Sequence, residues 1–554
     1  MESCLRRRLA FSTGRDGSSV MREKGMDGWL IRGLAWALAA LVLLPVLVVI
    51  WRSTGEAGPA WGDVVENRLW GHVRQTLLLL VAVVSLALLL GGPTAWMVSV
   101  YDFPGRRWMR WMLMLPMAMP GFVAAGAYVD VLEGLIPFYV WVRTNWGIDA
   151  FLKIQELAPW VFAVGVLGTT LFPYVFLSCL AVFSRQAAGA LEAARLLGAG
   201  GLRVFFTVGA PMARPALVAG GSLVAMEAMN DYGVVSAFGL TPLTPGIFRA
   251  WGEGEPVVAM RLAMGLLVML GLGLVFERGQ RGRRRFATDA AEGILGRRKL
   301  PWWLGLGALG LCLVPLALGF LLPGWRLAGW AWASRDSAEW AAHARAAWHS
   351  FSLAGGAVLL VMASAFLLVA GQRALGSRSV TVAQKIGLAG YGFPSALVAV
   401  GVGAVVVWIS RNVPGAGGLA LSASVSGLMI AYWVRFLAVG IQPVVAGFEK
   451  LPGSLREAAR VLGEKPMGAM WRVDLPLVWP ALVAGATLCF IDVFKELTLT
   501  LVLRPFNFET LATRTYRLTD EGRLAEAALP GLGLVMLSLV GLIPLTRWMR
   551  LSEK

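Results

Sequence analysis

The chain has 554 residues, of which 57% are hydrophobic and only 15% are charged. Soluble proteins carry about 25% charged residues, so this composition excludes an ordinary soluble globule. The formal net charge is +17, but the sequence has no soluble basic face with interleaved aromatic residues. We therefore expect no nucleic-acid partner.

Twelve apolar segments follow one another along the chain, each long enough for the roughly 20 helical residues that cross a bilayer. The sequence therefore predicts an all-α polytopic membrane protein that is surrounded by the lipid bilayer. The first segment is longer than the apolar part of a signal peptide, so we expect it to be retained. The segments lie near residues 29–51, 74–99, 107–132, 157–183, 216–239, 256–276, 301–322, 350–371, 384–410, 421–447, 481–503 and 524–546.

Basic residues gather in the N-terminal tail, after the second segment, within residues 277–300 and at the C-terminus. With an even number of spans, all four places lie on one side of the membrane. The positive-inside rule makes that side the cytoplasm. We expect a multi-pass inner-membrane protein with both termini in the cytoplasm. The longest external loop, roughly residues 323–349, is shorter than the ~40 residues that a separate domain usually needs.

The sequence has no pattern typical of a soluble catalytic or metal site. Cys4, Cys179, Cys312 and Cys489 are scattered, with no spacing typical of a disulfide framework or a zinc site. No GxxxxGKS/T phosphate-binding loop is present, and no nucleophile stands with a base and an orienting residue. We therefore expect no bound cofactor, no fixed metal and no enzymatic activity in this chain.

An internal repeat is the most informative feature. Residues 192–220 align without gaps onto residues 457–485, at a constant separation of 265, and 14 of the 29 positions are identical. Such a match in register indicates a tandem duplication rather than shared composition. The matched positions include Glu192 with Glu457, Gly198 with Gly463, Pro211 with Pro476, and Pro215 with Pro480.

The duplication divides the chain into two transmembrane units of six spans each. The first unit is expected at 29–276, with its repeated loop at 187–215, after a cytoplasmic N-terminal tail at 1–28. The second unit is expected at 301–554, with its repeated loop at 452–480. A basic cytoplasmic linker, 277–300, joins the two units.

Each repeated loop is expected to form a short amphipathic helix, a stop at Gly198 or Gly463, a second short helix and a proline at the membrane re-entry. Glycine suits the left-handed position after a helix, and proline favours a new helix start. Ser454 and Glu457 have the spacing of a capping box, whereas the first copy has Gly189 at the place of Ser454.

The repeated loops resemble the EAA motif of ABC importer permeases. The matching residues are Glu192, Ala193, Ala194 and Gly198 in the first copy, and Glu457, Ala458, Ala459 and Gly463 in the second. The resemblance implies the ABC type I importer fold, with these residues on coupling helices that dock into two ATP-binding cassette subunits. Those partners would use ATP-Mg, and a periplasmic substrate-binding protein would deliver the solute. The alternative is a helical loop that only caps the membrane.

Five charged residues lie within the fifth and eleventh predicted spans. Glu227 and Asp231 stand one helical turn apart in the fifth span, and Asp492 and Glu496 repeat this spacing in the eleventh, beside Lys495. A charge at the bilayer centre costs about 2.5–3.5 kcal/mol, so we expect all five to face the bundle interior. The i, i+4 spacing puts each carboxylate pair on one helix face. The five residues are therefore predicted to line a substrate pathway or a gate.

Four carboxylates and one ammonium sum to about −3 if all are ionised. This charge favours a hard, oxygen-preferring cation or another cationic solute, and opposes sulfate, molybdate or phosphonate. The alternative is a buried ion-pair network in which Lys495 pairs with Asp492 or Glu496. Such a network would hold the two halves in register or work a gate.

A second resemblance concerns the solute. The segments Lys495-Glu496-Leu497, Leu503-Arg504-Pro505-Phe506 and Thr510-Leu511-Ala512 resemble the ferric-iron permeases, as do Asn230–Ser236 and Gly246–Trp251. Thr498 stands where that family usually has proline. The resemblance implies import of Fe(III) by alternating access, with transient Fe(III) contacts at Glu227, Asp231, Asp492 and Glu496.

Two other functions stay open at this point: an ABC permease for thiamine or a polyamine, and a proton-coupled secondary transporter whose carboxylates carry protons. The methionines of the third span are interpreted as packing residues, and the three histidines as ordinary residues at external edges. Pro120-Gly121 and Pro394 interrupt their spans and are expected to be either hinges or kinks near the pathway, or simple packing kinks. The methionines are Met109, Met112, Met114, Met117 and Met119, and the histidines are His72, His343 and His349.

Overall fold

The computed structural model describes residues 16–56, 58–186, 193–194, 196–198, 200–281, 297–412, 425–452, 454–464 and 466–551. Within these ranges the regular structure is helical except for two short strands, β1 (Tyr101–Asp102) and β2 (Arg298–Lys299). The strands pair in parallel and tie the end of the basic linker to the loop after the second span. The predicted all-α class is confirmed.

The first half contains long helices interrupted by short helical turns. Its elements are α2 (Asp16–Ser53), α3 (Pro59–Asp63), η1 (Val64–Arg68), α4 (Leu69–Val100), α5 (Arg106–Met112), η2 (Leu115–Ala118), α6 (Gly121–Glu133), α7 (Ile136–Trp146), α8 (Ile148–Ala181), η3 (Val182–Gln186), α10 (Gly201–Val204), η4 (Phe205–Gly209), α11 (Ala210–Asn230), α12 (Gly233–Ala237), α13 (Leu243–Gly252) and α14 (Pro256–Arg281).

The second half repeats this order. Its elements are α15 (Trp302–Leu316), η5 (Ala317–Leu321), α16 (Leu322–Ser334), α17 (Trp340–Leu375), α18 (Arg378–Ala389), η6 (Gly390–Gly392), α19 (Ser395–Asn412), α20 (Val425–Glu449), α21 (Ser454–Val461), α22 (Pro466–Ala469), η8 (Met470–Asp474), α23 (Leu475–Phe494), α24 (Thr498–Leu503), α25 (Leu511–Asp520) and α26 (Leu524–Leu551). The π-helical turns η4 and η8 precede α11 and α23 at the same separation of 265 residues as the sequence repeat.

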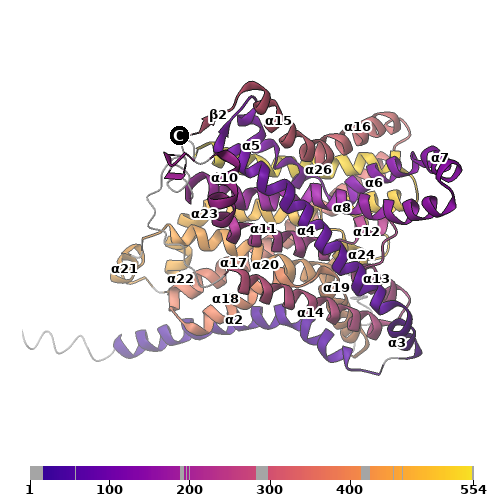
Figure 1. Ribbon diagram of the computed structural model, residues 1–554. Coiled ribbons are helices and arrows are strands. Elements are labelled where there is room, and N and C mark those ends of the chain that lie inside the picture. The colour runs from indigo at the N-terminus through magenta and orange to yellow at the C-terminus, as the bar shows by residue number, and fades with distance from the viewer. Residues whose placement is uncertain are drawn as a thin grey trace, which may run out of the picture.

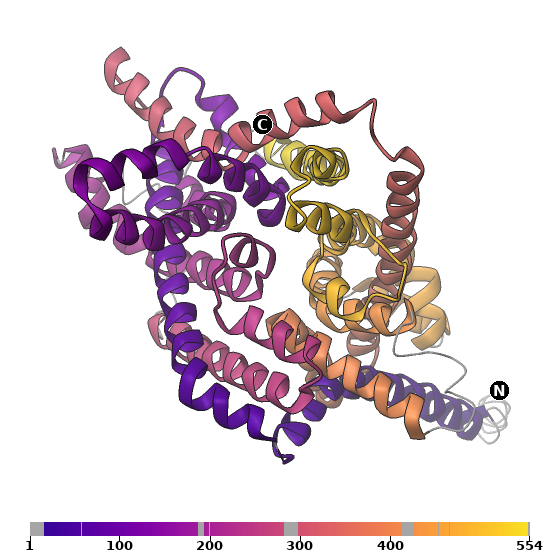
Figure 2. The same ribbon diagram turned by 90° about the vertical axis from the view of Figure 1, so that its right-hand side faces the viewer.

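Both halves pack by one scheme. In the first half α4 packs against α8 and α11, and in the second α17 packs against α20 and α23. The first helix of each half also reaches the other half: α2 packs along α18 and α19, while η5 and α15 contact α8 and α5 (Figure 2). The two halves are therefore interlocked, because the first helix of each half packs against helices of the other half.

The spans differ in several respects from the twelve that the sequence predicts. Among the described residues, ten helices are long and apolar enough to cross a membrane, or eleven if one bent pair counts as a single span. The predictions of continuous spans at 216–239 and 481–503 are wrong. The helices α11 and α23 end at Asn230 and Phe494, and the chain restarts as the short helices α12 and α24. The segment 323–349 is also helical rather than a loop, since α16 and α17 occupy most of it.

Proline breaks two spans where the sequence predicts. The helices Arg106–Ala118 and Gly121–Glu133 meet at Pro120 with a bend of 87°. In the second half, η6 and Pro394 separate α18 from α19. Proline has no N–H for the helical ladder, which favours a break at these two positions, although other prolines such as Pro93 and Pro173 lie inside continuous helices.

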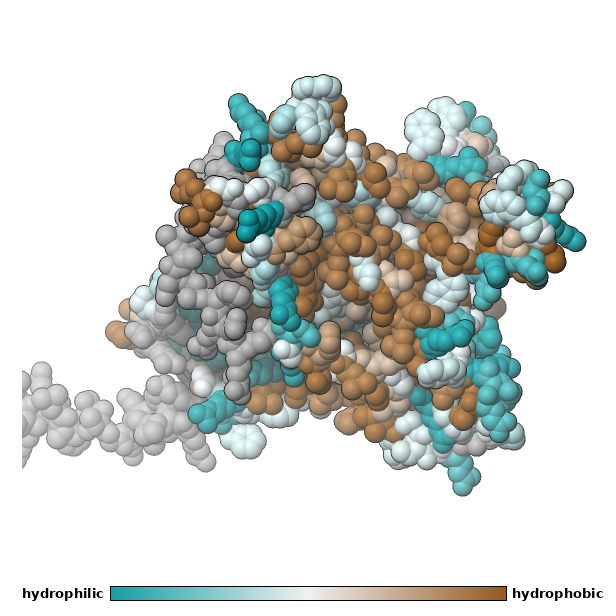
Figure 3. All heavy atoms as spheres, in the orientation of Figure 1, coloured by the Kyte–Doolittle hydropathy of each residue, from teal (hydrophilic) through white to brown (hydrophobic). Residues whose placement is uncertain are grey.

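The surface shows how the chain lies in a bilayer. A brown apolar surface separates two more polar ends (Figure 3), and side chains such as Leu89, Leu272 and Leu359 are 66 to 74% exposed. Lipid covers such side chains in a membrane protein. The start of α2 and the end of α26 lie at the same end of the molecule as α21 (Figure 1).

Candidate functional site

The repeated loops lie together at one polar end of the molecule, where α10 and α21 are found (Figure 1). Gly198 and Gly463 both adopt left-handed backbone conformations, with φ of +80° and +83°, so the predicted helix stops are confirmed. Ala193 and Ala194 are helical, and α21 contains Ala458 and Ala459. Glu192 lies outside the described residues. The side chain of Glu457 also lies outside the described residues, so its capping box with Ser454 stays a prediction.

Just before each of these glycines, the loops present apolar side chains to solvent. Leu196 and Leu197 are each 88% exposed, and their counterparts Val461 and Leu462 are 87% and 84% exposed. Exposed apolar pairs at a polar end of a membrane protein mark a surface that another protein covers. Both copies of the repeat therefore have an exposed pair of apolar side chains, in addition to the motif residues identified from the sequence.

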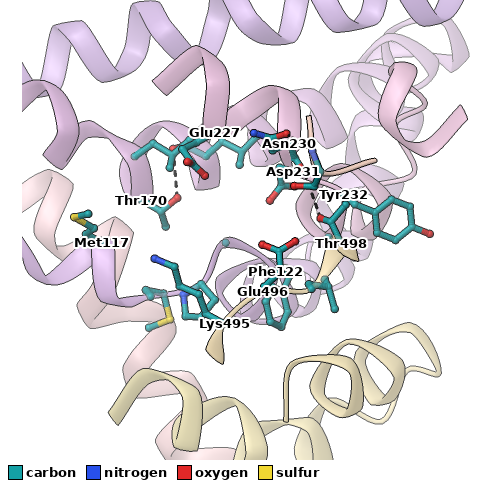
Figure 4. A pocket seen from close by; sticks show the side chains of 18 of the residues that line it. Met117, Phe122, Thr170, Glu227, Asn230, Asp231, Tyr232, Lys495, Glu496 and Thr498 are labelled. Carbon is teal, nitrogen blue, oxygen red and sulfur yellow. Dashed lines mark hydrogen bonds between the residues drawn. The ribbon is translucent and has the colours of Figure 1, made fainter. Parts of the chain in front are cut away.

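A small cavity of about 130 Å³ lies between the two halves. Figure 4 shows Glu227 and Asp231 on one side of it and Lys495 and Glu496 on the other. The structure therefore brings four of the five predicted residues to one pocket. The fifth, Asp492, does not line it but forms an ion pair with Lys495, with Oδ1 3.0 Å from Nζ.

The carboxylates Asp231 and Glu496 do not lie within continuous helices as the i, i+4 spacing predicts. Asp231 follows the end of α11, and Glu496 follows the end of α23. Asp231 Oδ1 accepts the backbone N–H of Val234 at 2.8 Å, and Glu496 Oε1 accepts that of Leu499 at 3.1 Å. The prediction of two unbroken faces is wrong because each carboxylate caps a new short helix.

A cation that the sequence analysis missed completes this cluster. Arg435 is only 3% exposed, lies in α20, and places Nε 4.0 Å from Oε2 of Glu496. Its Nη1 also donates to the carbonyl of Phe393 at 3.1 Å. The available signal was a lone arginine inside a predicted span, which is a functional or structural marker in its own right.

The two halves contribute unequally to the charge. Lys495 and Arg435 both belong to the second half, where they pair with Asp492 and Glu496. Glu227 accepts the hydroxyl of Tyr391 at 2.6 Å, and among the described residues neither Glu227 nor Asp231 forms an ion pair. Four carboxylates against two cations leave about −2 when all are ionised, rather than the −3 expected without Arg435.

Asn230 holds the halves together beside this pocket. Its side-chain oxygen accepts the backbone N–H of Ser395 at 2.9 Å, and its carbonyl accepts the hydroxyl of Thr498 at 3.3 Å (Figure 4). Both donors belong to the second half. The position therefore links the end of α11 to the starts of α19 and α24.

Residues 87–282 and 346–554 match the family described as the binding-protein-dependent transport system inner membrane component. These two segments cover well over half of the chain and fall in the two structural halves. The chain belongs to this family. It is therefore a multi-pass inner-membrane permease, a transport subunit and not an enzyme.

Three known relatives show how the permease compares along its length. It is 23% identical over 512 residues to the Fe(3+)-transport system permease protein FbpB 2 of Haemophilus influenzae, covering 89% of this chain and 93% of that protein. It is 26% identical to the sulfate transport system permease protein CysW of Escherichia coli K12, covering 38% of this chain and 70% of that protein. It is 29% identical to the putative 2-aminoethylphosphonate transport system permease protein PhnU of Salmonella typhimurium, and the match covers 44% of this chain and 90% of that protein.

The histidines of the permease have structural contacts. Nδ1 of His72 lies 2.5 Å from the carbonyl of Thr241, and Nδ1 of His349 lies 3.0 Å from that of Glu509. His343 accepts from Arg514 Nε at 3.1 Å. Each of the three rings therefore connects a helix to a loop or to a neighbouring helix.

The third-span methionines divide into two groups. Met109 and Met114 are buried in the core and Met112 packs against it, which agrees with their interpretation as packing residues. Met117 and Met119 instead line the central pocket, on the turn before Pro120. They supply part of its apolar wall, opposite a set of oxygen atoms.

Proposed function

We propose that this permease imports Fe(III) into the cytoplasm by alternating access, together with two ATP-hydrolysing subunits and a periplasmic binding protein. Both termini and both repeated loops would face the cytoplasm. ATP-driven closure of the ATPase pair would move the two loops and thereby re-orient the halves around the central pocket. ATP-Mg would be bound and used by the partner subunits.

The exposed pairs Leu196–Leu197 and Val461–Leu462 support the docking of two ATPase subunits. Each pair directly precedes a left-handed glycine, so the short helix ends sharply and leaves its tip free to enter a groove. Two equivalent tips at one end of the molecule match two equivalent partners.

The observation that carries the cargo proposal is the pair of first-half carboxylates, Glu227 and Asp231, with which no described cation forms an ion pair. Glu227 and Asp231 line the pocket beside the oxygen atoms of Asn230, Thr170 and Tyr174. A hard cation prefers oxygen ligands of this kind. The similarity to FbpB 2 along nearly the whole chain supports iron among the hard cations.

Uptake of radioactive iron tests the cargo. In cells that depend on this permease, the double variant Glu227→Gln, Asp231→Asn is expected to lose most uptake while the protein stays in the membrane. Competition by unlabelled Fe(III), but not by thiamine, spermidine or sulfate, supports iron. Competition by thiamine or spermidine would indicate that the transported solute is another cation. Competition by sulfate would indicate that the solute is an anion.

The energy source of transport and the docking of the ATPase subunits are tested separately. Uptake that follows the proton gradient and continues without ATP would favour a proton-coupled transporter. Removal of both motif glutamates, Glu192→Ala with Glu457→Ala, is expected to weaken ATPase binding and uptake together. If both survive, these loops do not dock the ATPase.

A further inference from the structure

A second cavity, of about 680 Å³, lies in the second half near the end opposite the repeated loops. It is formed by the start of α17, the end of α24, the loop 504–510 and α25, on the side that faces the viewer in Figure 2. We call it the outer basic pocket. Its lining includes Arg345, His349, Arg504, Phe506, Glu509 and Arg514.

Positive charge dominates the outer basic pocket. Three arginines line it against one carboxylate, Glu509, and that carboxylate is already engaged. Glu509 accepts from Arg514 at 3.1 Å and from Arg517 at 2.7 Å, while Arg504 lies 3.9 Å away. The exposed Arg345 and the partly exposed Arg504 therefore offer donors to an anionic group from outside.

The loop beside the pocket presents an apolar tip. Phe506 is 90% exposed, and its neighbour Asn507 is the one non-glycine residue with positive φ among the described residues. Asparagine adopts this left-handed conformation more readily than other non-glycine residues, so it suits a tight turn at this position. Here Glu509 binds two arginines, and Thr510 caps α25 through Thr513. The loop is thus a rigid support for an exposed aromatic ring.

In the part of the chain that the structure describes, the first half differs at the place that corresponds to this pocket. Its corresponding loop joins α12 to α13 through Phe238–Pro242 only, contains no arginine, and has Gly239 at its left-handed position. Thr241 in that loop is bound to Gln75 rather than left free. The pseudo-twofold symmetry of the permease is therefore broken on this face.

We propose that the outer basic pocket receives acidic side chains of the periplasmic binding protein, with Phe506 inserted beside them into that protein's surface. The inference rests on the proposed function, in which such a protein delivers the solute. Arginines around an aromatic anchor are the residues that protein interfaces favour at their centre. Because the corresponding first-half loop, residues 238–242, has neither an arginine nor an exposed aromatic ring, the pocket fixes which lobe of the binding protein lies over which half.

The short helix α24 connects the outer basic pocket to the central pocket. Its first residue, Thr498, lines the central pocket, and its fourth, Leu501, lines the outer one. Six helical residues span only about 9 Å. A protein docked at Arg504 would therefore contact the far end of the helix that Glu496 caps, next to the opening through which the solute must pass.

The test uses the permease assembled with its ATPase partner in lipid nanodiscs, titrated with the purified binding protein. Arg345→Glu and Phe506→Ala are each expected to weaken binding about tenfold or more, and Arg345→Glu to reduce the salt dependence of association. Arg143→Glu, on the exposed α7 of the first half, is the matched control and is expected to bind normally. Both pocket residues are exposed, so basal ATPase activity should be unchanged.

Unchanged affinity in both pocket variants would overturn the proposal. So would binding of inorganic phosphate to the permease alone that Arg345→Glu abolishes while binding-protein affinity stays the same, since the pocket would then be a small-anion site. A wild-type complex whose ATPase ignores the binding protein altogether would instead contradict the proposed function, so the two failures are distinguishable.

Discussion

Asp231 and Glu496 occupy equivalent positions in the two halves, 265 residues apart, and perform the same local task. Each accepts the backbone N–H of the residue three positions on, Val234 at 2.8 Å and Leu499 at 3.1 Å. Both also line the central pocket. The permease therefore uses one carboxylate per half both to cap a short helix and to line the central pocket.

The two tasks of Asp231 can be separated by substitution. Asp231→Asn keeps an acceptor for the Val234 N–H but removes the charge, so the free energy of unfolding should change little while iron uptake falls. Asp231→Ala removes the cap as well and should cost about 1 kcal/mol more. Thermal unfolding in detergent and uptake in cells measure the two effects. Normal uptake by Asp231→Asn would leave the residue with only its capping role.

Arg435 should be essential for stability through Glu496. Arg435→Met leaves a buried carboxylate without its cation, and breaking a buried pair in this way costs about 3–5 kcal/mol. The double variant Arg435→Met, Glu496→Gln removes both charges and should recover most of that loss. Denaturant unfolding of the purified protein measures both. A double variant no more stable than the single one would show that Arg435 acts through other contacts, such as Phe393.

The left-handed glycines of the repeated loops can be tested as a pair. Gly463→Ala and Gly198→Ala place a side chain at φ near +80°, at a cost of about 1 kcal/mol each, and should weaken ATPase binding by distorting the helix end. Gly200→Ala is the control, because a side chain there meets open space and has no unusual φ. Pull-down of the ATPase with each variant measures the effect. If all three variants bound the ATPase equally well, the left-handed glycines would not be needed for docking.

Glu509 should make the outer loop sensitive to acid. Burial alone would raise the pKa of Glu509, but hydrogen bonds and charge from Arg517 and Arg514 outweigh it and hold the pKa below its usual value. A lowered pKa in the folded state means stability that is fully present above the unfolded pKa of about 4.3 and is lost as pH falls through the folded value.

The check compares the wild type with Glu509→Gln across a pH series. The difference in thermal unfolding temperature should be constant near neutral pH and shrink below about pH 4, because the protonated carboxyl then resembles the amide. A difference that does not depend on pH would assign the effect of the variant to packing rather than to charge.

Much of the architecture of the permease could be predicted from the sequence, because the signals are local residue preferences or repeats along the chain. Apolar segment length revealed the membrane class, and the repeat at a separation of 265 residues predicted the two halves and their loops. Glycine and proline marked the stops at Gly198 and Gly463 and the break at Pro120, because their backbone restrictions act at the residue itself. Exposed pairs such as Val461–Leu462 lay within the recognised loops, but their exposure required the structure.

The sequence by itself therefore determined that the chain is a duplicated membrane bundle with two equivalent loops and a set of carboxylates within its spans. Only the tertiary structure decided which charges meet. The pairing of Arg435 with Glu496 depends on how α20 packs against α23, and the contact of Tyr391 with Glu227 depends on how the two halves interlock. Such contacts join residues tens to hundreds of positions apart, and no spacing along the chain encodes them. Packing thus paired both cations, Lys495 and Arg435, with second-half carboxylates, and left Glu227 and Asp231 without an ion pair among the described residues.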